Sequence, residues 1–295
     1  MLLALLCAGC APHQEPEPAT DPPPPAAQTT SDTLLVLGSW SAPVSGWGQE
    51  IAVYEDGLVM VQWSEYEETP EPFGRYVQHV AVRRVPPAEL DGLRTLVHGD
   101  AFGAARSAYH QDGVHDGGSL VVGGQKVTDR RITIVNRPAD LPEELRATQV
   151  ALDALAETTK TQGQPAFAHG PDRVVALWRF TRGDDSKQLT VFASGVLELR
   201  TLYTSSMTAH AADDYPTPHA VTGMANSSDL EALVAALDEF DGFGDRRMEV
   251  TPDRRTTDTL YFGNEGLEQQ LPTNPPPGLV KVLSVLEALE SALDG

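Results

Sequence analysis

Apolar and polar residues alternate along several short stretches of the chain, and longer stretches carry leucines at helical spacing. Alternation at 51–54 and at 189–192, each followed by a glycine-containing turn, predicts two β-hairpins. Further strands are expected at 76–85, 120–122, 131–135, 259–262 and 267–271. Apolar stripes over 141–155, 230–237 and 279–293 predict amphipathic helices, the second with Ser228 and Glu231 as a capping pair.

This pattern occurs twice along the chain. At an offset of 138 positions the hairpin regions coincide in the pairs Trp40/Trp178, Ile51/Leu189, Val53/Val191, Tyr54/Phe192 and Gly57/Gly195. Offsets of 140 and 134 align the pairs His79/His219, Leu90/Leu230, Leu93/Leu233, Leu145/Leu279, Leu152/Leu286 and Leu155/Leu289. We therefore predict a duplicated unit, with Trp40 and Trp178 at equivalent positions.

The first ten residues form a short apolar segment that ends in Ala8-Gly9-Cys10. This segment resembles a bacterial lipoprotein signal peptide, although Cys7 stands where the lipobox usually has leucine and no basic residue precedes it. The resemblance implies cleavage before Cys10, lipidation of Cys10 and membrane attachment. It also implies export to the outer membrane, because Ala11 is not an aspartate.

The segment from Ala11 to Asp32 is rich in proline and has no lysine or arginine. Such a composition favours an extended, disordered tether, with a reach of roughly 60–70 Å at about 3 Å per residue. The expected organisation is a signal peptide at 1–9, a tether at 10–32, repeats at 33–157 and 169–295, and a linker at 158–168.

The order of elements within each repeat indicates the α+β class. We expect two tandem copies of a small antiparallel sheet with two helices packed on it. Because each repeat contains a complete set of strands and helices, each should bury its own core. The two repeats should then meet through a modest, partly polar interface.

Acidic residues outnumber basic ones by 42 to 21, which gives a formal net charge of −21. This excess argues against nucleic acid as a partner, because phosphate binding depends on clustered lysine and arginine. A basic protein or peptide of the cell envelope fits the charge better. After Cys7 and Cys10 the chain has no cysteine, so the body cannot form a disulfide or a thiolate metal site.

Two loops carry residues that could bind a divalent cation. The first combines His110 and His115 with Asp112 and Asp116, and the second combines His210 and His219 with Asp213 and Asp214. Neither spacing matches a known metal motif, so an ordinary solvated loop is the competing interpretation and no metal or other cofactor is assigned. The alignment of His79 with His219 favours a structural role for both histidines.

Aromatic residues gather among acids in the first repeat. Trp47, Trp63, Tyr66 and Phe73 lie near Glu65, Glu67, Glu68 and Glu71, where they could form a protein-contact or carbohydrate-contact surface. The alternative is that these aromatic side chains pack over the edge of the sheet.

No catalytic residue is predicted, since the chain lacks a nucleophile elbow, a phosphate loop and a zinc-binding His-Glu-x-x-His motif. The leading hypothesis is a non-enzymatic, lipid-anchored binding module of the cell envelope. A second hypothesis rests on a resemblance to emfourin, a bacterial inhibitor of thermolysin-like proteases, which is carried by 237–244, 259–262 and 275–289. A third, a metal-dependent hydrolase, rests on the loop histidines alone.

Overall fold

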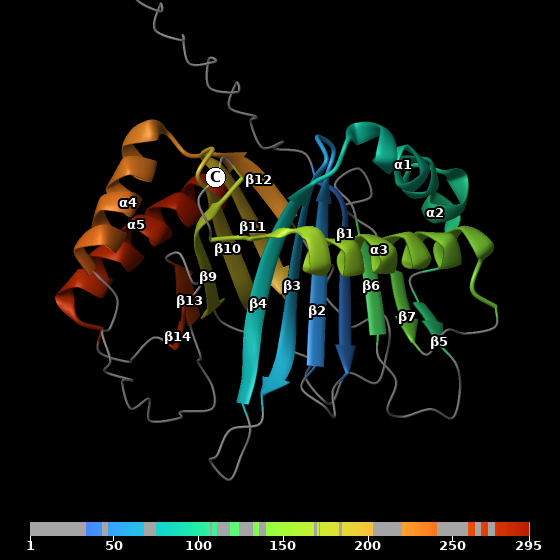
Figure 1. Ribbon diagram of the computed structural model, residues 1–295, viewed down its shortest axis with the longest axis horizontal. Helices are drawn as coiled ribbons and strands as arrows, with labels where there is room; N and C mark the ends of the chain where they lie inside the picture. Colours follow the sequence, from blue (N-terminus) through green and yellow to red (C-terminus); the bar gives the residue numbers. More distant parts are fainter. Residues whose placement is uncertain are drawn as a thin grey trace, which may run out of the picture.

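The computed structural model describes residues 34–42, 47–67, 75–106, 108–110, 119–123, 132–135, 140–167, 170, 172–182, 185–202, 220–240, 259–262, 267–270 and 275–294. These residues form two sheets, each accompanied by helices (Figure 1). The class is α+β, and the two sheets correspond to two tandem copies of the predicted unit.

The first sheet contains eight strands among the described residues, in the spatial order β5-β7-β6-β1-β2-β3-β4-β8. Its strands are β1 (Leu34–Ala42), β2 (Trp47–Tyr54), β3 (Leu58–Glu67), β4 (Arg75–Arg84), β5 (Ala108–His110), β6 (Ser119–Gly123), β7 (Ile132–Val135) and β8 (Gln164–Pro165). The pairing is antiparallel throughout, apart from the parallel pair β5 and β7. The associated helices are η1 (Pro87–Leu90), α1 (Asp91–Val97), α2 (Asp100–Ala104) and α3 (Glu143–Gln162).

The second sheet contains six described strands in the order β12-β11-β10-β9-β13-β14. They are β9 (Val174–Arg182), β10 (Asp185–Phe192), β11 (Val196–Leu202), β12 (Ala220–Met224), β13 (Thr259–Phe262) and β14 (Leu267–Gln270), with helices α4 (Ser227–Phe240) and α5 (Pro277–Asp294). Read from the other edge, this order repeats the order β7-β6-β1-β2-β3-β4 of the first sheet. The predicted duplication is therefore present in the strand topology.

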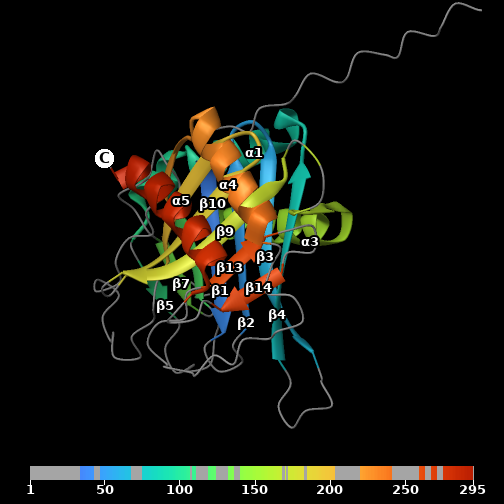
Figure 2. The same ribbon diagram turned by 90° about the vertical axis from the view of Figure 1, so that its left-hand side faces the viewer.

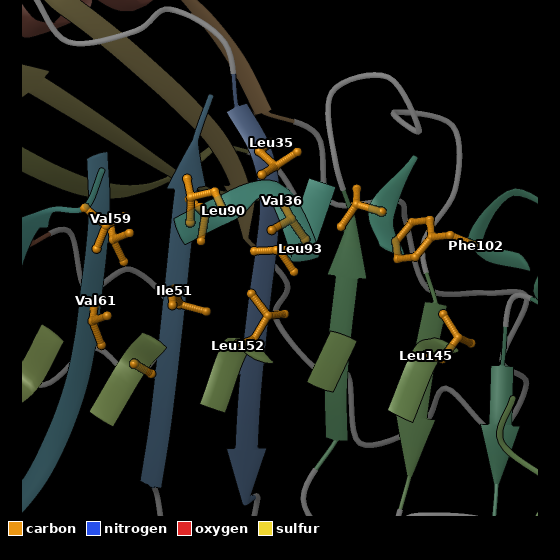
Figure 3. Packing of buried hydrophobic residues seen from close by; sticks show 14 of the residues in the cluster. Leu35, Val36, Ile51, Val59, Val61, Leu90, Leu93, Phe102, Leu145 and Leu152 are labelled. Atoms are coloured by element: carbon orange, nitrogen blue, oxygen red, sulfur yellow. The ribbon is translucent and has the colours of Figure 1, made fainter. Parts of the chain in front are cut away.

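Each repeat has an apolar core between its helices and one face of its sheet. In the first repeat, Ile51, Val53, Val59 and Val61 of the sheet pack with residues of the helices (Figure 3), which include Leu90, Leu93, Leu145 and Leu152. In the second repeat, Leu189, Val191, Leu197 and Leu199 pack with Leu233, Leu279, Leu286 and Leu289. Apart from Leu90 and Leu93, these helical residues belong to the predicted leucine stripes, so the stripes do mark the faces that cover the sheets.

A third apolar cluster lies between the two sheets. It contains Tyr54, Leu58 and Met60 from the first hairpin, and Phe192 and Val196 from the second, all of them buried. The layers therefore run helices, sheet, sheet, helices, and Figure 2 shows α4 and α5 in front of the second sheet. The expectation of a modest, partly polar interface is wrong in extent, because residues of β1 to β4 and of β9 to β11, on the faces that their own helices leave uncovered, are buried between the sheets.

The two hairpin turns have the same geometry. Gly57 and Gly195 have φ angles of 95° and 88°, and their amides donate hydrogen bonds to the carbonyls of Tyr54 and Phe192 over 3.0 and 2.9 Å. Positive φ favours glycine, which has no Cβ to clash with the backbone. Beside these turns the rings of Tyr54 and Phe192 meet edge to face at 6.1 Å, so equivalent residues contact each other across the interface.

The tryptophan alignment holds relative to β6 and β13, where Trp40 pairs with Leu120 and Trp178 with Leu260, which the offset of 140 aligns. It differs by two residues when it is measured from the hairpins. Strand β1 has a bulge at Leu35 and strand β9 has one at Val175, since Leu34 and Val174 pair with Tyr54 and Phe192. Val174 is thus the counterpart of Leu34, and Trp178 is the counterpart of Gly38. The bulges fix this register because they turn two consecutive residues, Leu35 with Val36 and Val175 with Ala176, toward the helices.

The expected linker at 158–168 is largely built into the fold. Residues 158–162 form the end of α3, strand β8 pairs with β4, and Ala166 and Phe167 are buried between the sheets. Arg84 adds a polar contact at the same junction, since it binds Asp172 at 2.5 Å and Asp56 at 2.9 Å.

Helix α4 begins two residues earlier than the predicted capping pair requires. Its cap is Asn226, whose side chain accepts a hydrogen bond from the amide of Asp229 at 2.8 Å. The predicted pair of Ser228 and Glu231 therefore lies within the helix, and Ser228 instead donates a hydrogen bond to the side chain of Asn226 at 2.6 Å.

We expect Tyr54→Phe to stabilise the protein by about 1 kcal/mol. The buried hydroxyl of Tyr54 has no hydrogen-bond partner among the described residues, and the counterpart in the second repeat is already a phenylalanine. Urea unfolding followed by circular dichroism measures the change. Phe192→Tyr is the reciprocal control and should lower the stability; equal stability of Tyr54→Phe and the wild type would contradict the assignment.

Candidate functional site

A group of polar side chains is enclosed between the two sheets, at the end of the hairpins away from their turns. We call it the inter-sheet charged cluster, and it consists of Glu50, Gln62, Arg179, Gln188, Thr190, Glu198 and Arg200. These residues alternate along their strands with core residues such as Leu197 and Leu199, which face the helices. The alternation of a β-strand therefore points the charged side chains at the opposite sheet.

The cluster joins the two repeats through specific contacts. Nη2 of Arg179 donates a hydrogen bond to Oε1 of Gln62 at 2.8 Å, and its Nε donates to Oε1 of Gln188 at 2.9 Å. Oε2 of Glu50 lies 3.8 Å from Nη2 of Arg179 and 3.8 Å from Nη1 of Arg200. Glu198 and Arg200 form an ion pair on their own strand. Two arginines of the second repeat thus share one glutamate of the first.

Burial changes the acid–base behaviour of the two most enclosed groups. Desolvation raises the pKa of Glu198 well above its usual value, and the negative charge of Glu50 adds to the rise. Desolvation lowers the pKa of Arg200 to about 10; the charge of Glu50 opposes this decrease and the charge of Arg179 adds to it. Glu50 and Arg179 are partly exposed, at 21% and 25%, so they form the rim of the cluster.

The hydrogen bonding inside the cluster is incomplete. Both carboxylate oxygens of Glu198, Nη2 of Arg200 and Nε2 of Gln62 are buried and lack a hydrogen bond of good geometry to a described residue. A buried ionic group without full hydrogen bonding is costly. The arrangement suits the uptake or release of a proton, because Glu198 can lose its charge without leaving its place.

The repeats differ at this cluster, which the sequence pattern did not predict. At the offset of 138, Glu198 and Arg200 stand where the first repeat has Met60 and Gln62. An alternation of leucine with charged residues is typical of a strand with one face in water, so the pattern alone indicated solvent exposure. The difference between the two repeats at these positions was the signal that could have revealed the cluster, but the positions are buried only because the first sheet covers them.

Most of the predicted site residues lie outside the described residues. These are Cys10, Asp112, His115, Asp116, His210, Asp213, Asp214, His219 and Phe73, while for Trp47, Tyr66 and His110 only the strand assignment is described. The described residues contain no group of three or more histidine, cysteine, aspartate or glutamate side chains placed to hold a metal ion. In the same residues, no helix combines the length and the apolar composition needed to cross a bilayer.

Trp63 belongs to a second cluster, on the outer face of the first sheet beside α3. Its ring packs against the first core and stacks on His79, with centroids 5.1 Å apart. Its indole nitrogen donates a hydrogen bond to Glu65 at 2.8 Å, and the ammonium group of Lys160 lies 5.9 Å from the ring. We call Trp63, Glu65, His79 and Lys160 the aromatic cluster. Of the aromatic residues that were predicted to gather among acids, Trp63 is half-buried and has a structural position against the core.

Comparison of the chain with protein-family models, with curated proteins and with solved structures gives no match.

We expect Arg200→Gln to destabilise the protein by about 3–5 kcal/mol, because it removes the cation paired with Glu198 and leaves this acid buried without its partner. The double variant Glu198→Met with Arg200→Gln restores the pair found in the first repeat and should recover most of this loss. Denaturant unfolding at pH 7 measures both. If the double variant is as unstable as Arg200→Gln alone, the loss does not arise from an unpaired charge.

Proposed function

We propose that the protein is a lipid-anchored binding module of the bacterial cell envelope, held at the outer membrane by Cys10. The observation that carries this proposal is the apolar segment ending in Ala8-Gly9-Cys10, followed by a proline-rich tether before the first strand at Leu34. A lipid anchor and a spacer of this kind place a body at the membrane surface while leaving it accessible to partners.

The arrangement of the body supports binding through its outer surfaces. The inner faces of the two sheets contact each other. The helices and the ends of the strands are therefore the surfaces that remain available for binding partners. The aromatic cluster offers such a surface in the first repeat. The carboxylate of Glu65 is 61% exposed there, and Glu157, which binds Lys160, is 68% exposed.

The charge of the protein indicates the chemistry of the partner. With a net charge of −21, the surface attracts cationic groups and repels anionic ones. Carboxylates beside a tryptophan and a histidine suit a basic peptide segment, since lysine and arginine can pair with the acids and lie against the rings. We therefore propose a basic envelope protein or peptide as the partner.

The anchor is tested by Cys10→Ala. We expect this variant to lose labelled palmitate and to move from the membrane fraction to the soluble fraction, because Cys10 is the cysteine that the proposed cleavage leaves at the new N-terminus. Cys7→Ala is the matched control and should remain membrane-bound. A Cys10→Ala protein that still fractionates with the membrane would refute the anchor.

The binding surface is tested by charge reversal at Glu65. We expect Glu65→Lys to weaken capture of basic envelope proteins on the order of tenfold. Glu231→Lys is the control, because Glu231 is also exposed but lies on α4 of the other repeat. Quantitative pull-down with the two variants and the wild type measures the difference. Equal losses in both would indicate nonspecific attraction to the net charge.

The same preparation distinguishes the inhibitor hypothesis. Inhibition of a thermolysin-like protease at stoichiometric concentration would favour the emfourin-like function over a general binding module. We expect no inhibition, because no residue of the chain matches an inhibitory motif.

A further inference from the structure

The contact between the sheets changes character along its length. Next to the turns it is formed by Tyr54 and Leu58 against Phe192 and Val196, which are apolar in both repeats. Two residues away from these positions, the first repeat has the apolar pair Ala52 and Met60, and the second repeat has Thr190 and Glu198. Two residues further still, the first repeat has Glu50 and Gln62, and the second has Gln188 and Arg200. One end of the interface is therefore hydrophobic and the other is charged.

Glu198 lies at the transition between these two ends. Its side chain is completely buried and it points toward the first repeat. The charged groups that face it are Arg200 on its own strand, Arg179 on β9 and Glu50 on β2. The other cluster members are uncharged amides and a hydroxyl, and α4 and α5 cover the opposite face of the sheet. None of the described histidines is among the groups that face Glu198.

We propose that Glu198 is a proton-operated latch between the repeats: when it is protonated the charged end of the interface stays closed, and when it ionises that end opens to water. The apolar end, where Tyr54 and Phe192 meet, keeps the two sheets together in both states. The device is independent of the proposed envelope function, because it uses only residues of the body.

The direction of the pH effect follows from the burial of the acid. Arg200 favours the ionised acid, but both carboxylate oxygens of Glu198 are buried without a hydrogen bond, and desolvation with the charge of Glu50 raises the pKa of Glu198 in the closed form. The opened form hydrates the carboxylate, so the pKa of Glu198 is higher when the interface is closed. Closure is therefore complete below the ordinary pKa of a glutamate. It weakens as the pH rises from there to the raised pKa, by up to about tenfold in the opening equilibrium for each pH unit.

Opening can be measured by thiol labelling of the full-length chain. Both natural cysteines lie in the first ten residues and can be replaced by serine, so an introduced cysteine is the only thiol. Thr190→Cys reports on the charged end, because Thr190 is buried there and is close to cysteine in size. Ala236→Cys reports on the second helix-covered core, where Ala236 is equally buried. Each labelling rate is divided by the rate of the unfolded variant at the same pH.

We expect the corrected labelling of Thr190→Cys to increase by about tenfold or more between roughly pH 5 and pH 9, and that of Ala236→Cys to stay constant. Adding Glu198→Gln, which imitates the protonated acid, should abolish the increase. Adding Glu290→Gln should not, because Glu290 is a buried glutamate paired with Lys187 outside the interface.

Three outcomes would overturn the latch. They are a labelling rate of Thr190→Cys that is independent of pH, an increase that persists with Glu198→Gln, and an equal increase at Ala236→Cys, which would mean global unfolding. If Glu198→Gln fails to fold, Glu198→Met takes its place under the same criteria, since it reproduces the residue of the first repeat.

Discussion

The structure depends on the burial of both faces of each sheet. The helices of a repeat cover one face only, and next to the turns the residues on the other face, such as Leu58 and Val196, are apolar and as buried as those beneath the helices. Each such side chain contributes roughly 1.5–3 kcal/mol when it leaves water. A single repeat would expose this whole surface, so the second repeat completes the fold of the first and the four-layer arrangement follows.

Duplication explains how one surface comes to match the other. Two copies of the same sheet, packed face to face, bring equivalent positions together, as the contact of Tyr54 with Phe192 shows. The copies are free to diverge where the contact does not require symmetry. At the end away from the turns, the second copy has Glu198 and Arg200 where the first has Met60 and Gln62. The first copy supplies Glu50, which pairs with Arg200, and Gln62, which accepts a hydrogen bond from Arg179.

The charged end of the interface is expensive in stability, since buried ion pairs recover little more than their desolvation energy. Methionine and glutamine at the corresponding positions of the first repeat show that the fold accommodates less polar residues there. What the charges add is specificity, because Arg179 and Arg200 bind Glu50 in only one alignment of the two sheets. They also add sensitivity to protons, through an acid that has no access to water while the sheets are closed.

The aromatic cluster around Trp63 lies on the other side of the first sheet, so binding at the outer surface and proton uptake at the interface use different parts of one scaffold.

The sequence by itself determined the local elements and their repetition. Alternation defined both hairpins, glycine marked both turns, and the leucine stripes identified the faces of α3, α4 and α5, because these features depend on the periodicity of a single segment. Tertiary structure decided what periodicity cannot encode. The bulges at Leu35 and Val175 set the register of the first strands, which displaced the tryptophan alignment by two residues relative to the hairpins. Residues 158–167 are part of the fold and not a free linker, because segments far away in the sequence contact them: β4 pairs with β8, and both sheets enclose Ala166 and Phe167. Glu198 and Arg200 have the pattern of a water-facing strand, and they are buried only because the sheet of the other repeat, built from a distant part of the chain, covers them.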